Sequence, residues 1–85
     1  MTKHYCYLVI TSKNTLYCGY TTNIDKRVAT HNAGRGAKYT KKRLPVQLVY
    51  SEEFATKIEA MQREYAIKQL SRDEKLKLIN DKTKT

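Results

Sequence analysis

In HYCYLVITSKNTLYCG, residues 4–19, two segments of alternating side chains flank a polar turn. In residues 4–10, tyrosine and valine alternate with cysteine, leucine and isoleucine, as in a strand with two different faces. TSKN, residues 11–14, supplies turn formers, and the alternation then resumes. The pattern predicts a β-hairpin in which Cys6 and Cys18 lie near each other behind the tyrosine face.

A helix is expected directly after the hairpin, because the apolar period changes there. Thr22 or Asn23 can cap its N-terminus, and Gly34 can end it. Between these signals, side chains recur at the i, i+3, i+4 and i+7 spacing of one helical face. Arg27 and His31 stand four residues apart and therefore share that face.

The remaining chain reads as a basic loop, a strand and two helices. Residues 34–45 hold five basic residues and two glycines, which indicates a loop that can contain one helical turn. Residues 46–54 alternate as a third strand, and residues 55–70 have a helical period. SRDE, residues 71–74, matches a capping box that starts a last short helix through Ile79.

The helix predicted over residues 55–70 is apolar on two flanks. One flank carries Ile58, Met61 and Tyr65, and the other carries Ala60 and Ile67. This pattern predicts a helix sandwiched between two layers. Glu64 projects between the flanks, and on local grounds it can form an ordinary ion pair with Lys68 at i+4.

Charge and length bound the function. A chain of 85 residues supports one small core, so a single domain over residues 1–85 is expected, with a frayed tail at 81–85. The net charge is +9, and residues 1–50 hold nine basic side chains against one acidic. This excess favours nucleic acid as the partner over ribosomal or membrane-surface attachment.

The sequence shows no membrane span or signal peptide, so a cytoplasmic protein is expected. Its two cysteines imply neither a disulfide scaffold nor a structural metal.

The motifs together resemble those of the GIY-YIG nuclease domain. Tyr5-Cys6-Tyr7 corresponds to the first tripeptide of that family and Tyr17-Cys18-Gly19 to the second, with the two key tyrosines ten residues apart. Arg27 matches the catalytic arginine of the first helix, and Glu64 in REYAIK matches the metal-binding glutamate of a later helix. HNAGRGAKYT, residues 31–40, is similar to the small stand-alone YhbQ/YazA-like (UPF0213-type) members.

This resemblance implies a fold, a reaction and a cofactor. The fold is α+β, with a small three-stranded antiparallel sheet flanked by helices in the order β-β-α-β-α-α. The reaction is DNA phosphodiester hydrolysis that leaves a 3′-hydroxyl and a 5′-phosphate, structure-guided or weakly sequence-specific. The cofactor is one divalent cation, Mg²⁺ or Mn²⁺, held by Glu64. The substrate is DNA in repair or recombination, branched or damaged DNA included, and RNA stays open.

By the same resemblance, four side chains are assigned to catalysis. Tyr7 is the expected general base, Tyr17 positions water or phosphate, Arg27 clamps the phosphate and His31 makes a second polar contact. The roles of the two tyrosines can be exchanged. A phenol has a pKa near 10, so a tyrosine base needs help from nearby cations. The basic loop is expected to bind nucleic acid through Arg35, Lys38, Lys41, Lys42 and Arg43.

Two other function classes fit the same residues. A non-catalytic nucleic-acid-binding module would use the basic loop equally well. In a structural protein, Tyr7, Tyr17 and Glu64 would form a buried hydrogen-bond network. Tyr20 stands where several of the nucleases carry a lysine, which predicts weaker catalysis.

Overall fold

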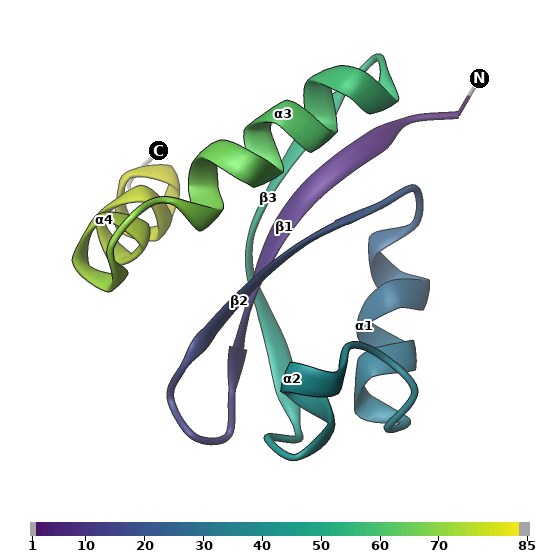
Figure 1. The fold of residues 1–85 in the computed structure, drawn as a ribbon, viewed down its shortest axis with the longest axis vertical. Coiled ribbons are helices and arrows are strands. Elements are labelled where there is room, and N and C mark those ends of the chain that lie inside the picture. The colour runs from purple at the N-terminus through teal and green to yellow at the C-terminus, as the bar shows by residue number, and fades with distance from the viewer. Residues whose placement is uncertain (1, 84–85) are drawn as a thin grey trace.

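The fold is a three-stranded antiparallel sheet with helices on both faces, which confirms the predicted α+β class. The structure is a computed structural model that describes residues 2–83. Its elements are β1 (His4–Thr11), β2 (Leu16–Thr21), α1 (Ile24–Asn32), α2 (Lys38–Lys41), β3 (Val46–Phe54), α3 (Lys57–Lys68) and α4 (Arg72–Thr83). The strand order is β2-β1-β3, so β1 is central and β2 and β3 form the edges (Figure 1).

The predicted hairpin is confirmed, and its register positions the later chemistry. β1 and β2 pair antiparallel, with Leu8 opposite Cys18 and Tyr7 opposite Gly19. Asn14 takes the left-handed backbone conformation of the turn, with φ 60°, a conformation that asparagine tolerates better than most residues. The register therefore follows from the alternation and the turn together.

The alternation along β1 divides the core into two clusters, one on each face of the sheet. The cluster beneath α3 and α4 is built from Cys6, Leu8, Cys18, Tyr50 and Ile67, with Val49, Phe54, Leu78 and Ile79 packed against it. The cluster on the α1 side is built from Tyr7, Val9 and Val46, with Tyr17, Val28 and Leu44 packed against it. Figure 1 shows α1 and α2 on one side of the twisted sheet and α3 and α4 on the other.

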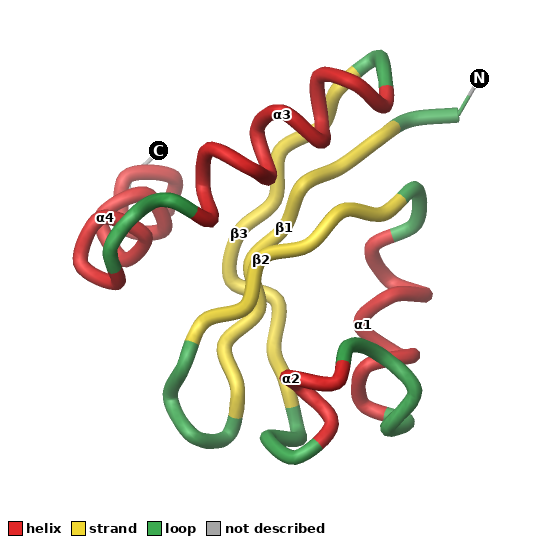
Figure 2. The backbone as a smooth tube through the Cα atoms, viewed as in Figure 1, coloured by secondary structure: helices red, strands yellow, loops and turns green. Residues whose placement is uncertain are grey.

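Helix ends lie close to where the local signals predict them. The Asn23 side chain accepts a hydrogen bond from the backbone N–H of Lys26 at 3.1 Å, and Gly34 follows α1 with φ +79°. The predicted capping box is confirmed, since Ser71 and Glu74 exchange side-chain to backbone hydrogen bonds of 2.9 and 3.2 Å. The basic loop contains one helical turn, α2 (Figure 2).

The prediction that the helix over residues 55–70 is sandwiched is wrong. Ala60 and Ile67 of α3 are fully buried against the sheet. The opposite flank faces solvent, with exposed fractions of 70% at Ile58, 45% at Met61 and 70% at Tyr65. The reason is that Leu78 and Ile79 of α4 pack on the sheet-side cluster and leave the outer flank of α3 uncovered.

The C-terminal helix is longer than the local signals predict. α4 continues to Thr83, so residues 81–83 of the expected tail are helical, while residues 84 and 85 lie outside the described part of the chain. Across residues 2–83, none of the helices combines the length and the apolar character that a bilayer crossing requires.

Candidate active site

Tyr7 lies across Gly19 of the neighbouring strand. The two residues are opposite each other in the hairpin register, and a Cβ at position 19 would stand 2.5 Å from the Tyr7 hydroxyl oxygen. Only glycine at position 19 leaves room for the Tyr7 ring and its hydroxyl group. The glycine of Tyr17-Cys18-Gly19 therefore determines where the Tyr7 hydroxyl can lie.

The Tyr7 hydroxyl begins a buried chain of hydrogen bonds. Its oxygen lies 2.9 Å from His31 Nε2, and His31 Nδ1 lies 2.8 Å from the Thr40 hydroxyl oxygen. Thr40 donates its one hydroxyl hydrogen to the Ala37 carbonyl at 2.9 Å, so it must accept from His31 Nδ1–H. A neutral imidazole protonated at Nδ1 has Nε2 as its acceptor. Tyr7 is thus the donor to His31, and the chain has one consistent direction.

The basic segment closes over His31. His31 is 1% exposed and Thr40 is fully buried. A Cβ at Gly36 would come within 2.2 Å of His31 Nδ1, so the backbone of the segment touches the imidazole ring at this point. The segment that carries the positive charge therefore also forms the wall of the histidine site.

Burial and neighbouring charges set the protonation states. Burial is the main reason why the pKa of Tyr7 is raised well above its ordinary value, and Tyr17 adds to it while Arg27 opposes it. Burial, followed by the charge of Arg27, lowers the pKa of His31. At neutral pH both groups are therefore uncharged, and Nε2 is free to accept a proton.

Arg27 lies on α1 with its side chain exposed. Within the described residues its guanidinium has no hydrogen bond or ion pair, although its charge acts on both Tyr7 and His31. It also lines an open depression with Thr21, Thr22, Asn23, Lys26 and Thr30. An unpaired guanidinium within electrostatic reach of the tyrosine is suited to bind an anionic group there.

Tyr17 connects the histidine to the surface. Its ring stands edge-on to His31, with centroids 5.5 Å apart and an interplanar angle of 68°. On its other side Tyr39 stacks at 5.9 Å with an interplanar angle of 22°. Arg43 lies over the Tyr39 ring, with its guanidinium carbon 4.1 Å from the centroid. Tyr7, Tyr17 and His31, predicted separately along the chain, are thus brought together.

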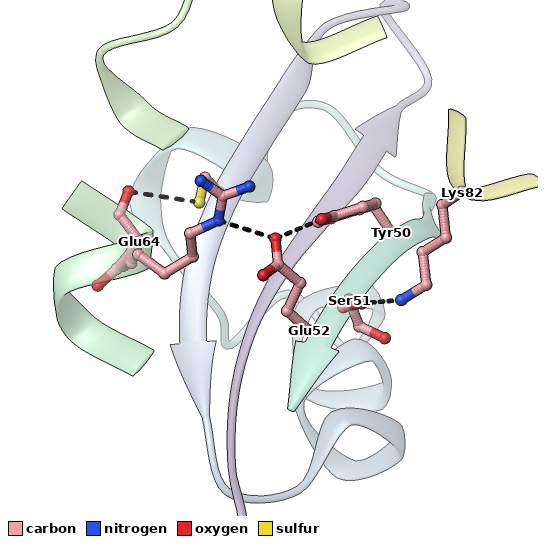
Figure 3. A network of polar contacts seen from close by, with 7 residues as sticks. Tyr50, Ser51, Glu52, Glu64 and Lys82 are labelled. Atoms are coloured by element: carbon pink, nitrogen blue, oxygen red, sulfur yellow. Dashed lines mark hydrogen bonds and ion pairs between the residues drawn. The ribbon is translucent and has the colours of Figure 1, made fainter. Parts of the chain in front are cut away.

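Glu64 lies on α3, on the other side of the sheet. Its carboxylate pairs with Lys68 at 3.2 Å, which confirms the predicted i+4 ion pair, and its side chain is 16% exposed. Its backbone oxygen accepts from the Cys18 thiol at 3.8 Å. The neighbouring Arg63 pairs instead with Glu52 on β3, at 2.9 Å, and Figure 3 shows Glu52 and Glu64 on different elements.

Glu64 nevertheless acts on the tyrosine site through its charge, since it contributes to raising the pKa of Tyr7. Residues 2–83 contain no group of three or more His, Cys, Asp or Glu side chains placed to share a metal ion. Glu64 by itself offers one carboxylate, whose charge the Lys68 ammonium balances. Such a donor suits a hard cation that keeps most of its ligands as water or phosphate oxygen.

Four of the five predicted nucleic-acid contacts lie together. Arg35, Lys38, Lys41 and Lys42 line one groove with Gly34 and Gly36. Arg43 does not line it, because its guanidinium lies on Tyr39 and donates to the Tyr39 carbonyl at 2.6 Å. The grouping of these four cations suits phosphate contacts.

Comparison with known proteins decides the family. Residues 3–77 match the model of the GIY-YIG catalytic domain. The chain belongs to the GIY-YIG family. Its members are generally endonucleases that act on nucleic acid and use a divalent metal ion.

Similar proteins span nearly the same length as this chain. A UPF0213 protein of Staphylococcus haemolyticus is 61% identical over 82 residues, which cover 96% of this chain and 100% of the relative. The solution NMR structure of a UPF0213 protein from Bacillus halodurans is 44% identical with a TM-score of 0.60, over 92% of this chain and 83% of that one. A solution NMR structure from E. faecalis is 36% identical with a TM-score of 0.67, over 100% and 91%. The chain is thus a UPF0213 member of the GIY-YIG family.

Sequence reasoning assigned no role to three residues of this GIY-YIG site. Thr40 orients His31, Gly36 makes room for it, and Tyr39 stacks on Tyr17. All three lie in the stretch GRGAKYT, residues 34–40, which carries part of the resemblance and in which the sequence assigns a binding role only to the basic residues. The uncharged residues of that stretch, placed between the cations, were the available signal.

Proposed function

We propose that the chain is a divalent-metal-dependent endonuclease that hydrolyses DNA phosphodiester bonds. The observation that carries the proposal is the directed chain from Tyr7 through His31 to Thr40, in a member of the GIY-YIG family. A buried tyrosine that donates to a neutral histidine has an acceptor for its own proton at 2.9 Å. This gives Tyr7 a means to act as a base.

Tyr7 works as a relay in this proposal. Because its pKa is raised by burial, it stays protonated at neutral pH and forms no phenolate in advance. It takes a proton from the attacking water while passing its own to His31 Nε2, 2.9 Å away. Thr40 holds the other imidazole nitrogen, which keeps the ring in the acceptor tautomer.

Arg27 and Tyr17 act on the phosphate. Arg27 has no partner within the described residues and its charge already reaches the Tyr7 hydroxyl, so it binds a non-bridging oxygen and stabilises the negative charge of the transition state. Tyr17, in edge contact with His31, positions the water or the phosphate beside the relay.

Glu64 is the residue that would hold the divalent cation. Its carboxylate is the donor chemistry that Mg²⁺ or Mn²⁺ prefers, and one protein carboxylate suffices when water and phosphate oxygens complete the shell. The bound cation would orient the phosphate and stabilise the leaving oxygen. The Lys68 ammonium lies 3.2 Å from Oε2 of this carboxylate, so the cation would use the other oxygen or displace the ammonium.

The cationic groove supports a substrate preference by shape. Arg35, Lys38, Lys41 and Lys42 offer contacts to phosphates, which carry no sequence information. Cleavage is therefore structure-guided or weakly sequence-specific, with branched or damaged DNA as the first candidates and RNA as a second class to compare.

Cleavage of linear, flapped and four-way-branched DNA, each with Mg²⁺, Mn²⁺ or EDTA, tests the proposal. Tyr7→Phe and His31→Gln should each lower turnover about 100-fold or more. The double variant should be no worse than either single variant, because both break one relay. Tyr17→Phe keeps the hydrogen bonds from Tyr7 to His31 and from His31 to Thr40, so it should lower turnover less than Tyr7→Phe does. Full activity of folded Tyr7→Phe, or cleavage that persists in EDTA, would overturn the proposal.

The metal role is tested separately with Glu64→Gln. This change keeps the volume and removes the charge, so metal-dependent cleavage should be lost while DNA binding is retained. Glu59→Gln, on the exposed part of the same helix, is the matched control and should cleave like the parent. If Glu64→Gln cleaves normally, or unfolds, then Glu64 is a structural ion-pair residue.

The Glu64–Lys68 ion pair also supports a second candidate function. A carboxylate whose charge is balanced within the protein needs no metal, which favours a non-catalytic nucleic-acid-binding module. Such a module would bind the same DNAs with equal affinity in EDTA and leave each of them intact.

A further inference from the structure

Two side chains near the site, Tyr39 and Arg43, have no function in the proposed reaction, and both belong to a stack that begins at Tyr17. The Tyr39 ring stacks with Tyr17, at 5.9 Å between centroids, and the Arg43 guanidinium carbon lies 4.1 Å from the centroid of the same ring. The inner end of the stack meets His31 through Tyr17. The stack therefore runs from the proton relay to the molecular surface.

The outer end of the stack is held in place and reaches solvent. Arg43 donates from Nη1 to the Tyr39 carbonyl at 2.6 Å, which fixes the guanidinium against the ring. Tyr39 remains 38% exposed and is one of the few large apolar side chains of the described chain with that much exposure. Arg43 itself is half-buried, so the planar cation and the ring together form a partly exposed surface.

The surroundings of this surface are cationic. Lys38, Lys41 and Lys42 belong to the same short segment and line the groove beside it. A planar aromatic and arginine surface beside phosphate-binding cations is how proteins bind unstacked bases, because aromatic rings and guanidinium planes both stack on the face of any base. A base that is paired within a duplex keeps both faces stacked and cannot occupy it.

We propose that the Tyr17–Tyr39–Arg43 stack is a binding site for an unpaired nucleobase, which stacks on the outer face of the Arg43 guanidinium. The inference rests on the proposed function and deepens it by naming the substrate class, nucleic acid with an unpaired nucleotide near the cleavage site. Tyr17 joins the stack to His31, so a strand bound there lies on the same side of the sheet as the relay. Single strands, flaps and frayed junctions fit this requirement, and blunt duplexes do not.

Binding in EDTA separates stacking from phosphate contact and from cleavage. Fluorescence anisotropy compares an oligothymidylate strand with an abasic strand of the same length, which has the same phosphates and no bases. The parent should bind the base-containing strand about 10-fold tighter or more, as expected when one base is stacked. Tyr39→Leu should bring the ratio of the two affinities close to one.

Two further variants identify the cause of that loss. Arg43→Lys keeps the charge but removes the planar guanidinium, so it should also lower the ratio and leave the affinity for the abasic strand nearly unchanged. Lys42→Gln is the control, since it removes one phosphate contact and should weaken both strands equally. Circular dichroism and thermal melting establish that each variant is folded.

Each outcome decides the matter. Equal affinity of the parent for both strands, or an unchanged ratio in folded Tyr39→Leu and Arg43→Lys, overturns the stacking site, and DNA cleavage would still support the proposed endonuclease. Failure of the parent to bind any strand or duplex overturns the proposed function and this inference with it.

Discussion

At the scale of single residues, two glycines place the groups of the proton relay. Tyr7 occupies the volume that a side chain at Gly19 would fill, and His31 occupies the volume beside Gly36. Neither glycine has to be explained by an unusual backbone angle, since close approach is sufficient. The motif Tyr17-Cys18-Gly19 therefore supplies both a tyrosine of β2 and, at Gly19, the room that Tyr7 of β1 occupies.

Gly19→Ala should displace Tyr7 from His31. The added Cβ would stand 2.5 Å from the Tyr7 hydroxyl oxygen, so the ring must move. We expect the free energy of unfolding to fall by about 1–3 kcal/mol, as in other overpacked cores, and turnover to fall as in Tyr7→Phe. Urea unfolding and the DNA cleavage assay measure the two effects.

Gly34→Ala is the control for that substitution. Its Cβ would meet nothing nearer than Leu44 at 4.0 Å, but its φ of +79° disfavours a side chain. We expect a cost of about 1 kcal/mol from the backbone alone with turnover preserved. Normal cleavage by Gly19→Ala would contradict the close-contact explanation.

The buried His31 should make stability depend on pH. Its pKa is lowered in the folded protein, so below its ordinary value of about 6.5 the unfolded chain binds the proton more readily. The free energy of unfolding should therefore fall as the pH drops from about 7.5 to about 5.5, by at most about 1.4 kcal/mol per pH unit. In His31→Gln, urea unfolding should show a smaller slope over this range. An equal slope would mean that another group carries the titration.

At the scale of elements, α3 is the most asymmetric. One flank is fully buried against the sheet, and the other exposes Ile58, Met61 and Tyr65 although its residues are equally apolar. The network of Tyr50, Glu52 and Arg63 ties the helix to β3, and Figure 3 shows it. The helix is therefore held by one apolar flank and a polar tie, and the second flank contributes little to folding.

Two isoleucines on this helix test that asymmetry. Ile67→Ala should lower the free energy of unfolding by about 2–5 kcal/mol, because Ile67 is fully buried in the core. Ile58→Ala removes the same atoms from a side chain that is 70% exposed, and should change stability by less than about 0.5 kcal/mol. Urea unfolding compares the two. Similar costs would mean that the outer flank is covered in solution.

At the scale of the whole molecule, the charge is concentrated on one part of the chain. Residues 1–50 carry a net charge of +8 of the total +9, and they supply β1, β2, α1 and α2 together with the tyrosine site. The positive field and the proton relay therefore lie in the same half of the sequence. This arrangement attracts a polyanion toward the side of the sheet where the relay is.

DNA binding should consequently depend on salt. If about four phosphates contact the cations of the groove, the logarithm of the binding constant should fall with a slope of about −3 to −4 against the logarithm of salt concentration. Lys41→Gln with Lys42→Gln should reduce that slope by about 2. Anisotropy titrations at several salt concentrations measure it, and an unchanged slope would place the groove outside the interface.

The elements were predictable because their signals are local. Each of these signals depends on residues a few positions apart. They are the hairpin, the helix cap at Asn23, the helix end at Gly34, the strand Val46–Phe54 and the capping box that begins at Ser71. The four catalytic candidates followed from the resemblance to the GIY-YIG family, and the structure brings Tyr7, Tyr17 and His31 into contact.

Only the tertiary structure decided what those elements do to one another. Tyr7 and His31 are 24 residues apart in sequence, and the direction of their hydrogen bond depends on Thr40, nine residues further on. Helical or strand periodicity cannot predict this chain of hydrogen bonds, because it forms only when the basic segment folds back over α1. In the same way, the sequence pattern predicts two apolar flanks on α3 and places Arg43 among the cations of the loop. The packing of α4 left one flank open, and the ring of Tyr39 took Arg43 out of the groove, because each surface pairs with the partner that the fold brings nearest.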